Sequence, residues 1–191
     1  VHTIILGGAA QRGHNRNGHA FCQFGSGMFT PGVFTHLPKQ FIMHPQEMFR
    51  EERELCAKGV MDAFDRTTIH RDALVISPYQ QAANRLREIA LGPNNHGSVG
   101  RGIRDTRCDH IEYSDQVLFA RDLGNPTVTR RKLKFLRDLK YEQFRDVISQ
   151  ANGNQAIKDQ LWVFKPDILE GHIEFFWRIS RKVQIVDNSW L

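Results

Sequence analysis

The chain has 191 residues, and 26 Lys and Arg against 21 Asp and Glu give it a formal net charge of +5 at pH 7. Hydrophobic residues make up 40% and charged residues 25% of the sequence, which is ordinary for a globular protein and excludes a collagen, a coiled-coil rod and a fully disordered chain. No apolar run approaches the roughly 20 residues of a membrane-spanning helix, so we expect no membrane partner.

The cysteines favour a reducing compartment. There are three of them, Cys22, Cys56 and Cys108, which is an odd number at wide spacings. Since the sequence also lacks a signal-peptide pattern, a disulfide scaffold is not expected, and we predict a cytoplasmic protein. The modest positive charge suits an anionic ligand and by itself favours nucleotides, phosphate and nucleic acid equally.

Hydrophobic patterning predicts strands that alternate with helices. The first helix is expected from Pro45, with Met48, Glu52 and Leu55 along one side and Gly59 as its end. Short apolar runs predict buried strands at residues 2–8, 73–76 and 183–187.

Further helices are expected in the second half of the chain. Ser77-Pro78 fits the N-cap and first position of a helix that Gly92-Pro93 ends. Residues 92–107 are predicted to form a loop rich in Gly and Arg. Apolar positions at helical spacing predict another helix over residues 129–148.

This alternation predicts an α/β fold with a mixed or mostly parallel central sheet flanked by helices. The length predicts a single domain over residues 1–191. Because the sequence begins and ends on patterns typical of buried strands, we expect a fragment of a larger domain. A complete compact domain with short tails is the alternative interpretation.

The most informative segment is Gly97-Ser98-Val99-Gly100-Arg101-Gly102-Ile103-Arg104. Its glycines let the backbone curl so that successive N–H groups converge on an anion. Ser98 adds a hydroxyl donor, and Arg101 and Arg104 add planar guanidinium groups suited to phosphate or carboxylate. The segment lacks the Lys-Ser/Thr ending of a P-loop. An ordinary glycine loop with solvated arginines is the alternative.

A second polar cluster spans Arg12–His19, where two His, two Asn and two Arg lie between glycines after a predicted strand. Loops beyond the carboxyl ends of strands are where α/β sheets bind ligands. A histidine in such a loop suits acid–base chemistry near neutral pH. A solvated polar turn explains the pattern equally well.

Two other polar patterns carry less weight. The His and Cys residues lack the paired short spacings of a structural zinc site, so zinc is not expected. The basic run Arg130–Lys140 is interleaved with leucines, which predicts the solvated face of an amphipathic helix. Nucleic-acid binding by this face is a less favoured hypothesis.

Taken in order, these segments resemble the adenylosuccinate synthetase family. Residues 13–19 are similar to the family's G-G-x-N-A-G-H-T segment, and residues 35–38 to its H-x-x-P-S-G strand and turn. Residues 71–84 resemble a hydrophobic strand followed by the family's Y-H-x-x-x-D. The most specific likeness is that of residues 97–103 to the G-T-T-G-R-G-I loop.

The resemblance implies a ligase that joins inosine monophosphate or a related purine nucleotide to aspartate, with GTP and magnesium as cofactors. His19 would be catalytic, stabilising charge on the phosphoryl oxygens, and the Gly18 carbonyl would lie near the magnesium ion. Arg101 would hold the aspartate carboxylate. The other substrate-binding residues would be Asn15, Ser98, Val99 and Arg121. Because the family is dimeric, the resemblance also implies a homodimer. It further implies that residues 1–191 are the N-terminal to middle part of a larger synthetase-like domain.

The sequence departs from the family pattern in several places. The opening G-D-E-G-K-G phosphate loop and the N-K-x-D guanine-binding segment are not found in the 191 residues. Ala20 replaces the threonine of G-H-T, and Val99 replaces the second threonine of G-T-T-G, so neither side chain donates a hydrogen bond. A non-catalytic homologue that binds a purine nucleotide or phosphate is therefore the main alternative.

Overall fold

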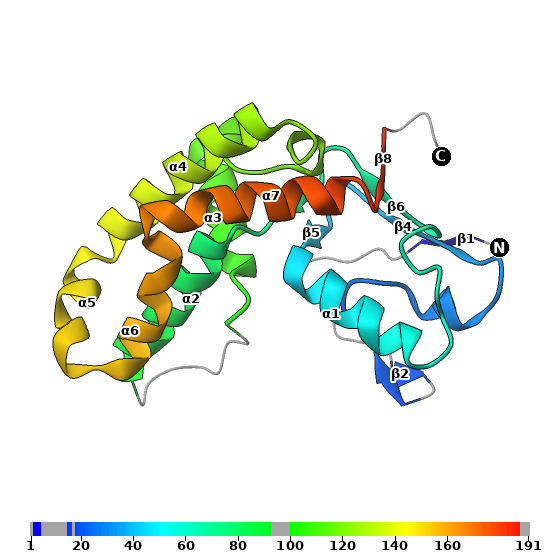
Figure 1. The fold of residues 1–191 in the computed structure, drawn as a ribbon, viewed down its shortest axis with the longest axis horizontal. Helices are drawn as coiled ribbons and strands as arrows, with labels where there is room; N and C mark the ends of the chain where they lie inside the picture. The colour runs from blue at the N-terminus through cyan, green and yellow to red at the C-terminus, as the bar shows by residue number, and fades with distance from the viewer. Residues whose placement is uncertain (1, 5–14, 17, 93–99, 188–191) are drawn as a thin grey trace. The chain divides into compact units, whose positions relative to one another are not determined.

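The structure is a computed structural model, and it describes residues 2–4, 15–16, 18–92 and 100–187 (Figure 1). These residues form two compact units. The first unit is assembled from Val1–Val75, Phe119–Gly124 and Phe176–Leu191, and the second from Ile76–Leu118 and Asn125–Phe175. The single domain expected from the length stays a prediction.

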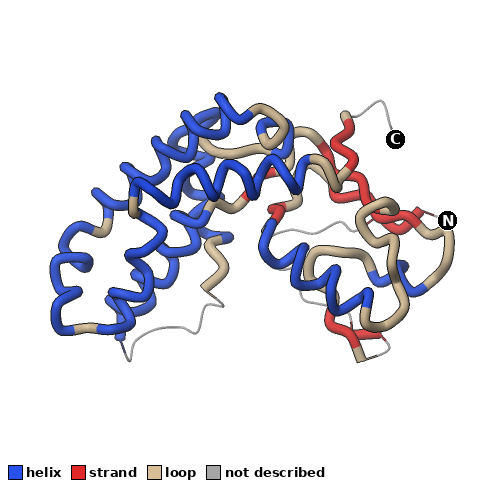
Figure 2. Tube along the Cα trace, viewed as in Figure 1, coloured by secondary structure: helices blue, strands red, loops and turns tan. Residues whose placement is uncertain are grey.

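A parallel sheet organises the first unit. Four strands are hydrogen-bonded in the order β1-β4-β6-β8, and each neighbouring pair is parallel. Figure 2 shows strands and helices together, and the predicted α/β class with parallel sheets flanked by helices is confirmed. The strands are β1 (His2–Ile4), β4 (Phe34–Leu37), β6 (Thr67–His70) and β8 (Gln184–Val186).

The apolar runs that were predicted to be strands do not all belong to this sheet. The run at residues 183–187 forms β8, while residues 5–8 of the first run lie outside the described residues. The run at residues 73–76 becomes β7 (Leu74–Val75), which pairs with β5 (Ile42–Met43) in a separate two-stranded parallel sheet. It is therefore buried as predicted, but it does not belong to the four-stranded sheet.

Helix α1 (Pro45–Cys56) belongs to the first unit and begins where predicted. The His44 side chain caps it by accepting a hydrogen bond from the Glu47 N–H at 3.4 Å. Its buried face contains Met48 and Leu55, together with Glu51 rather than the expected Glu52. The chain leaves the helix through Gly59, whose φ of +88° lies in the left-handed region.

The second unit is helical. Helix α2 (Pro78–Leu91) begins with a capping box, in which Ser77 and Gln80 each accept a backbone hydrogen bond from the other. Gly92, with φ of +53°, ends it as predicted. Helix α3 covers Ile103–Tyr113, so the predicted loop over residues 92–107 is wrong from Ile103 onward. There, Asp105 and Thr106 are buried, and the pairing of Asp105 with Arg87 of α2 stabilises a helix in a segment whose Gly and Arg content predicted a loop.

The remaining helices follow in chain order. Helix α4 starts at Pro126, three residues before the predicted Thr129, because the Asn125 side chain caps the N–H groups of Thr127 and Val128. The predicted continuous helix breaks at Phe144. The α-helices are α4 (Pro126–Gln143), α5 (Arg145–Ser149), α6 (Gln155–Leu161) and α7 (Leu169–Ser180). The short 3₁₀-helices are η1 (Ser26–Phe29), η3 (Ser114–Gln116), η4 (Ala120–Asp122), η5 (Gln150–Gly153), η6 (Trp162–Phe164) and η7 (Pro166–Ile168).

The basic run on α4 is not the fully solvated face that its pattern predicts. Lys132 and Lys140 are buried, and Lys140 forms an ion pair with the equally buried Asp109. Arg130 is paired with Glu170. The long aliphatic stems of lysine pack among apolar side chains while a carboxylate neutralises the charged end. This arrangement reduces the basic surface available to nucleic acid.

Among the described helices, none is both long and apolar enough to cross a membrane.

Candidate functional site

Three of the residues predicted to form a site lie in one short hairpin of the first unit. Strand β2 (Asn15–Arg16) pairs antiparallel with β3 (His19–Ala20), and the register places Asn15 opposite Ala20. Gly18 has φ of +66°, a left-handed conformation that glycine adopts without steric cost. The hairpin therefore brings the backbones of Asn15, Gly18 and His19 together, as the candidate site requires.

The His19 side chain is 2% exposed. Its Nε2 lies 3.4 Å from Oε1 of Glu51, and its Nδ1 lies 3.6 Å from Oε2 of Glu54. The rings of Phe21 and Phe29 meet the imidazole edge-on, with centroids 4.6 and 6.1 Å away. The ring is thus held between two carboxylates and two aromatic side chains. A phosphoryl oxygen can reach it only if one of these neighbours moves.

Glu51 fixes the segment that carries His19. The side chain is 1% exposed, and its two oxygens accept hydrogen bonds from the backbone N–H of Cys22 at 3.0 Å and of Gln23 at 2.6 Å. In turn, the Gln23 side-chain oxygen accepts a hydrogen bond from the His44 N–H at 2.9 Å. Burial raises the pKa of Glu51, although these hydrogen bonds and His19 act in the opposite direction.

The described residues do not by themselves form a magnesium site. Mg²⁺ is usually held by one or two carboxylates together with water and substrate phosphates. Within the described ranges, no group of three or more His, Cys, Asp or Glu is placed to hold a metal ion. A Cβ atom added at Gly18 would lie 3.9 Å from Nζ of Lys58, which is a cation rather than a carboxylate. We therefore derive no catalytic step through magnesium.

In the second unit, Arg101 lies between two glycines with positive φ. Gly100 has φ of +65° and Gly102 has φ of +82°, so the chain turns sharply on both sides of Arg101 before α3 begins. The Gly102 N–H donates to Oδ1 of Asn84 at 3.1 Å, which ties the turn to α2. The Arg101 side chain is half-buried. Such a turn presents a guanidinium group at the start of a helix, where anions are favoured.

The tight approach at Gly102 explains why this position is glycine. A Cβ atom there would lie 2.8 Å from the Gln81 backbone nitrogen and 2.9 Å from the Gln80 carbonyl carbon. Both are main-chain atoms of α2 and cannot move aside. The first turn of α3 is held further by Asp105, which accepts two hydrogen bonds from Arg87 at 2.8 and 2.7 Å.

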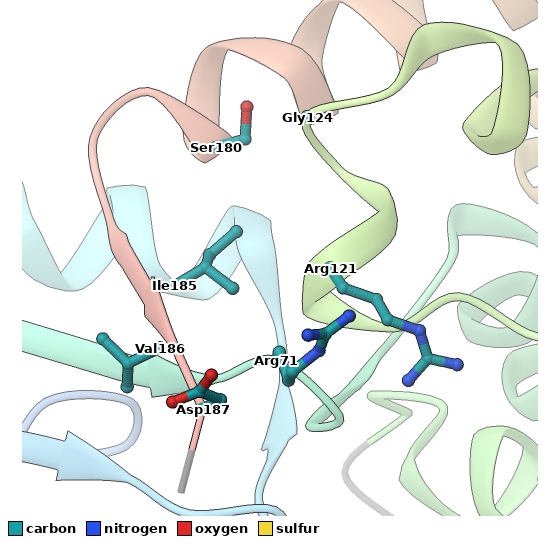
Figure 3. Close-up of a pocket in the computed structure, with 7 residues that line it drawn as sticks. All are labelled: Arg71, Arg121, Gly124, Ser180, Ile185, Val186 and Asp187. Carbon is teal, nitrogen blue, oxygen red and sulfur yellow. The ribbon is translucent and has the colours of Figure 1, made fainter. Parts of the chain in front are cut away.

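Arg121 lines a pocket in the first unit, shown in Figure 3. The pocket has a volume of about 310 Å³ and is lined by Arg71, Arg121, Gly124, Ser180, Ile185, Val186 and Asp187. Arg71 follows the last residue of β6, and Asp187 follows the last residue of β8. The pocket therefore lies at the carboxyl ends of two adjacent parallel strands, the usual place for a ligand in an α/β sheet.

Some of the predicted site residues cannot be placed, and the rest belong to different units. Ser98 and Val99 lie outside the described residues, as do residues 12–14 of the polar cluster. His19 and Arg121 belong to the first unit and Arg101 to the second. The roles given to all these residues by resemblance stay predictions.

Glu51 and Arg71 were missed by reasoning from the sequence. A signal was available for Glu51, because it lies three residues after Met48 and four before Leu55, both on the buried face of α1. A carboxylate at such a position needs partners inside the protein. Arg71 had no comparable signal, since its position depends on the pairing of strands distant in sequence.

Comparison with known proteins gives a consistent result. The family model of adenylosuccinate synthetase matches residues 3–174. Adenylosuccinate synthetase of Bordetella petrii is 32% identical over 148 residues, which cover 75% of this chain and 33% of that protein. The enzyme of Paraburkholderia xenovorans is 31% identical over 159 residues, which cover 83% of this chain and 32% of that protein. The chain thus spans about a third of the length of these curated relatives.

The fold is also similar to that of a solved structure. A fully ligated adenylosuccinate synthetase from Plasmodium falciparum matches 97% of this chain and 40% of its own, with a TM-score of 0.71. The sequence identity in that match is 18%, so the likeness concerns the fold.

Proposed function

Because the chain belongs to the adenylosuccinate synthetase family, we propose that it acts in a ligase that joins a purine nucleotide to aspartate with GTP and magnesium. The nucleotide is inosine monophosphate or a close relative, and the reaction belongs to purine nucleotide biosynthesis. The observation that carries the proposal is the Arg101 turn. Its glycines match the family's G-R-G pattern, and Gly102 packs against α2 where a side chain cannot fit.

The reaction has two steps in this proposal. The terminal phosphoryl group of GTP passes to the purine oxygen, and GDP leaves. The aspartate nitrogen then bonds to the purine carbon, the phosphorylated oxygen departs as inorganic phosphate, and the nitrogen loses its proton. Both steps place negative charge on phosphoryl oxygens, which an adjacent hydrogen-bond donor stabilises.

Each site residue has a proposed role in these steps. His19 donates a hydrogen bond to the transferring phosphoryl group after the imidazole is released from Glu54. Arg101 binds the aspartate carboxylate through two N–H groups, because a guanidinium matches the geometry of a carboxylate. Asn15, Ser98, Val99 and Arg121 contact the nucleotide, and the Gly18 carbonyl would supply one oxygen ligand to a bound magnesium ion. The protein is proposed to act as a cytoplasmic homodimer, which sedimentation analysis would test.

The test is an assay of the purified chain with inosine monophosphate, aspartate, GTP and Mg²⁺, followed by mass spectrometry for adenylosuccinate and by phosphate release. We expect Arg101→Ala to raise the KM for aspartate about tenfold or more, since it removes a bidentate ion pair. The matched control is Arg145→Ala, which removes an arginine of α5 in the same unit whose side chain is 67% exposed, and it should leave the kinetics like those of the wild type. Equal effects of the two substitutions would contradict the role of Arg101.

One observation favours a second candidate function, a homologue that binds a purine nucleotide without catalysis. His19 is enclosed by Glu51 and Glu54, so the proposed catalytic ring is not open to a phosphoryl group in this conformation. Calorimetric titration with inosine monophosphate distinguishes the two functions. Binding without any product in the assay would support the non-catalytic homologue, whereas product formation would exclude it.

A further inference from the structure

We infer that the pocket beside Arg71 binds a small ligand through a single phosphate or carboxylate group, and that Arg71 is the residue that holds this group. The pocket contains Arg71 and Arg121 as cations and Asp187 as an anion. Arg71 takes no part in the proposed function, although Arg121, which lines the same pocket, is proposed there to contact the nucleotide. The inference concerns Arg71 and holds whether or not the ligand is that nucleotide.

The backbone of Arg71 is fixed on both sides. Its N–H donates to the Val186 carbonyl at 2.7 Å, and its carbonyl accepts a hydrogen bond from the Arg121 N–H at 2.9 Å. These bonds join the ends of β6 and β8 to the segment that begins with η4. The position from which the side chain extends is therefore set before any ligand binds, which lowers the entropic cost of binding.

The guanidinium group of Arg71 has no partner in the part of the chain that the structure describes. Within the described residues, it makes no hydrogen bond or ion pair, and Figure 3 shows it pointing into the pocket. Arginine is suited to bind an oxyanion through two parallel N–H groups. Since no carboxylate of the described chain is paired with it, this charge is available to a ligand.

Arg121 differs from Arg71 in this respect. Its guanidinium forms an ion pair with Asp72 and stacks over the Phe119 ring at 4.1 Å. The Asp72 N–H in turn donates to Nδ1 of His70 at 3.0 Å. Asp72 is thus held against Arg121 and does not neutralise Arg71. Of the two arginines in the pocket, Arg71 is the one that we assign to the ligand.

The remaining walls limit the class of ligand. A volume of about 310 Å³ is near the lower end of the range for small-molecule pockets, so the ligand is small. Ile185 and Val186 supply apolar surface for an uncharged part of the ligand. The Asp187 carboxylate lines the same pocket and repels additional negative charge. One anionic group is therefore favoured over a polyphosphate.

Calorimetric titrations at constant ionic strength test this inference. The probes are inorganic phosphate, butyrate as a carboxylate with a short apolar body, and tripolyphosphate as a polyanion. We expect saturable binding of phosphate or butyrate at one site, and the stronger of the two identifies the anionic group. Tripolyphosphate should bind no more tightly than phosphate. Tighter binding of tripolyphosphate would overturn the preference for a single group.

Three variants locate the site. Arg71→Ala should weaken binding about tenfold or more, because it removes a charge-assisted hydrogen-bond donor. The matched control is Arg53→Ala, which removes an exposed arginine of α1 in the same unit and should leave the affinity within about twofold, since exposed charges contribute little. Gly124→Val keeps the charges and fills the pocket, where a Cβ atom would lie 3.9 Å from the Ser180 hydroxyl, and it should also weaken binding.

The inference fails if the wild-type chain shows no saturable binding of phosphate or butyrate. It also fails if Arg71→Ala and Arg53→Ala weaken binding equally, which would indicate non-specific attraction to a basic protein. Circular dichroism establishes that each variant is folded. If Gly124→Val does not fold, the comparison of the two arginine variants decides the question alone. None of these outcomes depends on ligase activity.

Discussion

Glu51 connects helix α1 to the strand that carries His19. The carboxylate is buried and accepts the N–H groups of Cys22 and Gln23, which lie just beyond β3. A buried acceptor of this kind determines the path of the backbone around it. Its contribution can be measured separately from any role of His19 in catalysis.

We expect Glu51→Ala to lower the free energy of unfolding by roughly 2 kcal/mol or more, because two buried N–H groups lose their acceptor. The measurement is urea denaturation followed by circular dichroism. The matched control is Glu52→Ala, the next residue of α1, which removes only the ion pair with Lys182 near the surface. That loss should cost less than about 1 kcal/mol. Similar costs for the two variants would contradict the role of Glu51.

The raised pKa of Glu51 predicts how stability depends on pH. A carboxyl group whose folded-state pKa exceeds its ordinary value of 4.5 stabilises the fold fully below that value. This contribution is lost as the pH rises through the folded-state pKa. Denaturation of the wild type and of Glu51→Gln should therefore show the stability of the wild type falling relative to the variant from acidic toward neutral pH. A constant difference would contradict the direction of the shift.

At the scale of elements, the start of α3 depends on the close contact between Gly102 and α2. A methyl group at this position meets backbone atoms of Gln80 and Gln81 at 2.8–3.0 Å and also requires a left-handed conformation. At Gly59, the conformation is equally left-handed, but the space around it is open. Comparing substitutions at the two glycines therefore distinguishes the cost of steric overlap from the cost of the left-handed conformation.

Gly102→Ala should destabilise the protein by several kcal/mol, whereas Gly59→Ala should cost about 1–2 kcal/mol, the strain of a left-handed residue alone. Urea denaturation of both variants measures the difference. Because the overlap would displace the turn, Gly102→Ala should also impair any ligand binding by Arg101. If the two alanines cost the same, the contact with α2 does not determine the residue at position 102.

Several elements were predictable from the sequence because the signal is local. Ser77-Pro78 marks the start of α2 through capping chemistry that involves only the adjacent residues. The strand β6 was not found by its pattern, because Thr67, Thr68 and His70 are polar although all are buried. Their burial follows from a central position in the sheet, between β4 and β8. Neighbouring strands of this kind are not visible in a local pattern.

At the scale of the whole molecule, the α/β class and the family could be predicted from the sequence, while the division into two units could not. The ordered motifs, above all the Gly-Arg-Gly turn, carried the family resemblance, and the family model matches residues 3–174. The division depends on which segments pack together. Phe119–Gly124 joins the first unit although the residues on both sides of it belong to the second. Nothing in its composition distinguishes it.

The candidate site was predictable in part for the same reason. Gly18 and His19 adjoin one another in the chain, so their association in a hairpin follows from a short polar turn. The pocket at Arg71 brings together residues from the end of β6, from the end of α7 and from β8. Such a site exists only after strands distant in the sequence have paired, and composition gives no indication of that pairing.

The assembly of the first unit from three segments has a consequence for the order of folding. The second unit is complete once Phe175 has left the ribosome, whereas the first still lacks β8. Until then, β6 has only β4 as a strand partner and exposes its other edge. Pairing of Thr68 with Gln184 closes a very long loop, which slows folding. During synthesis, the helical unit can therefore fold first, and β8 can join the sheet only after Gln184–Val186 has emerged.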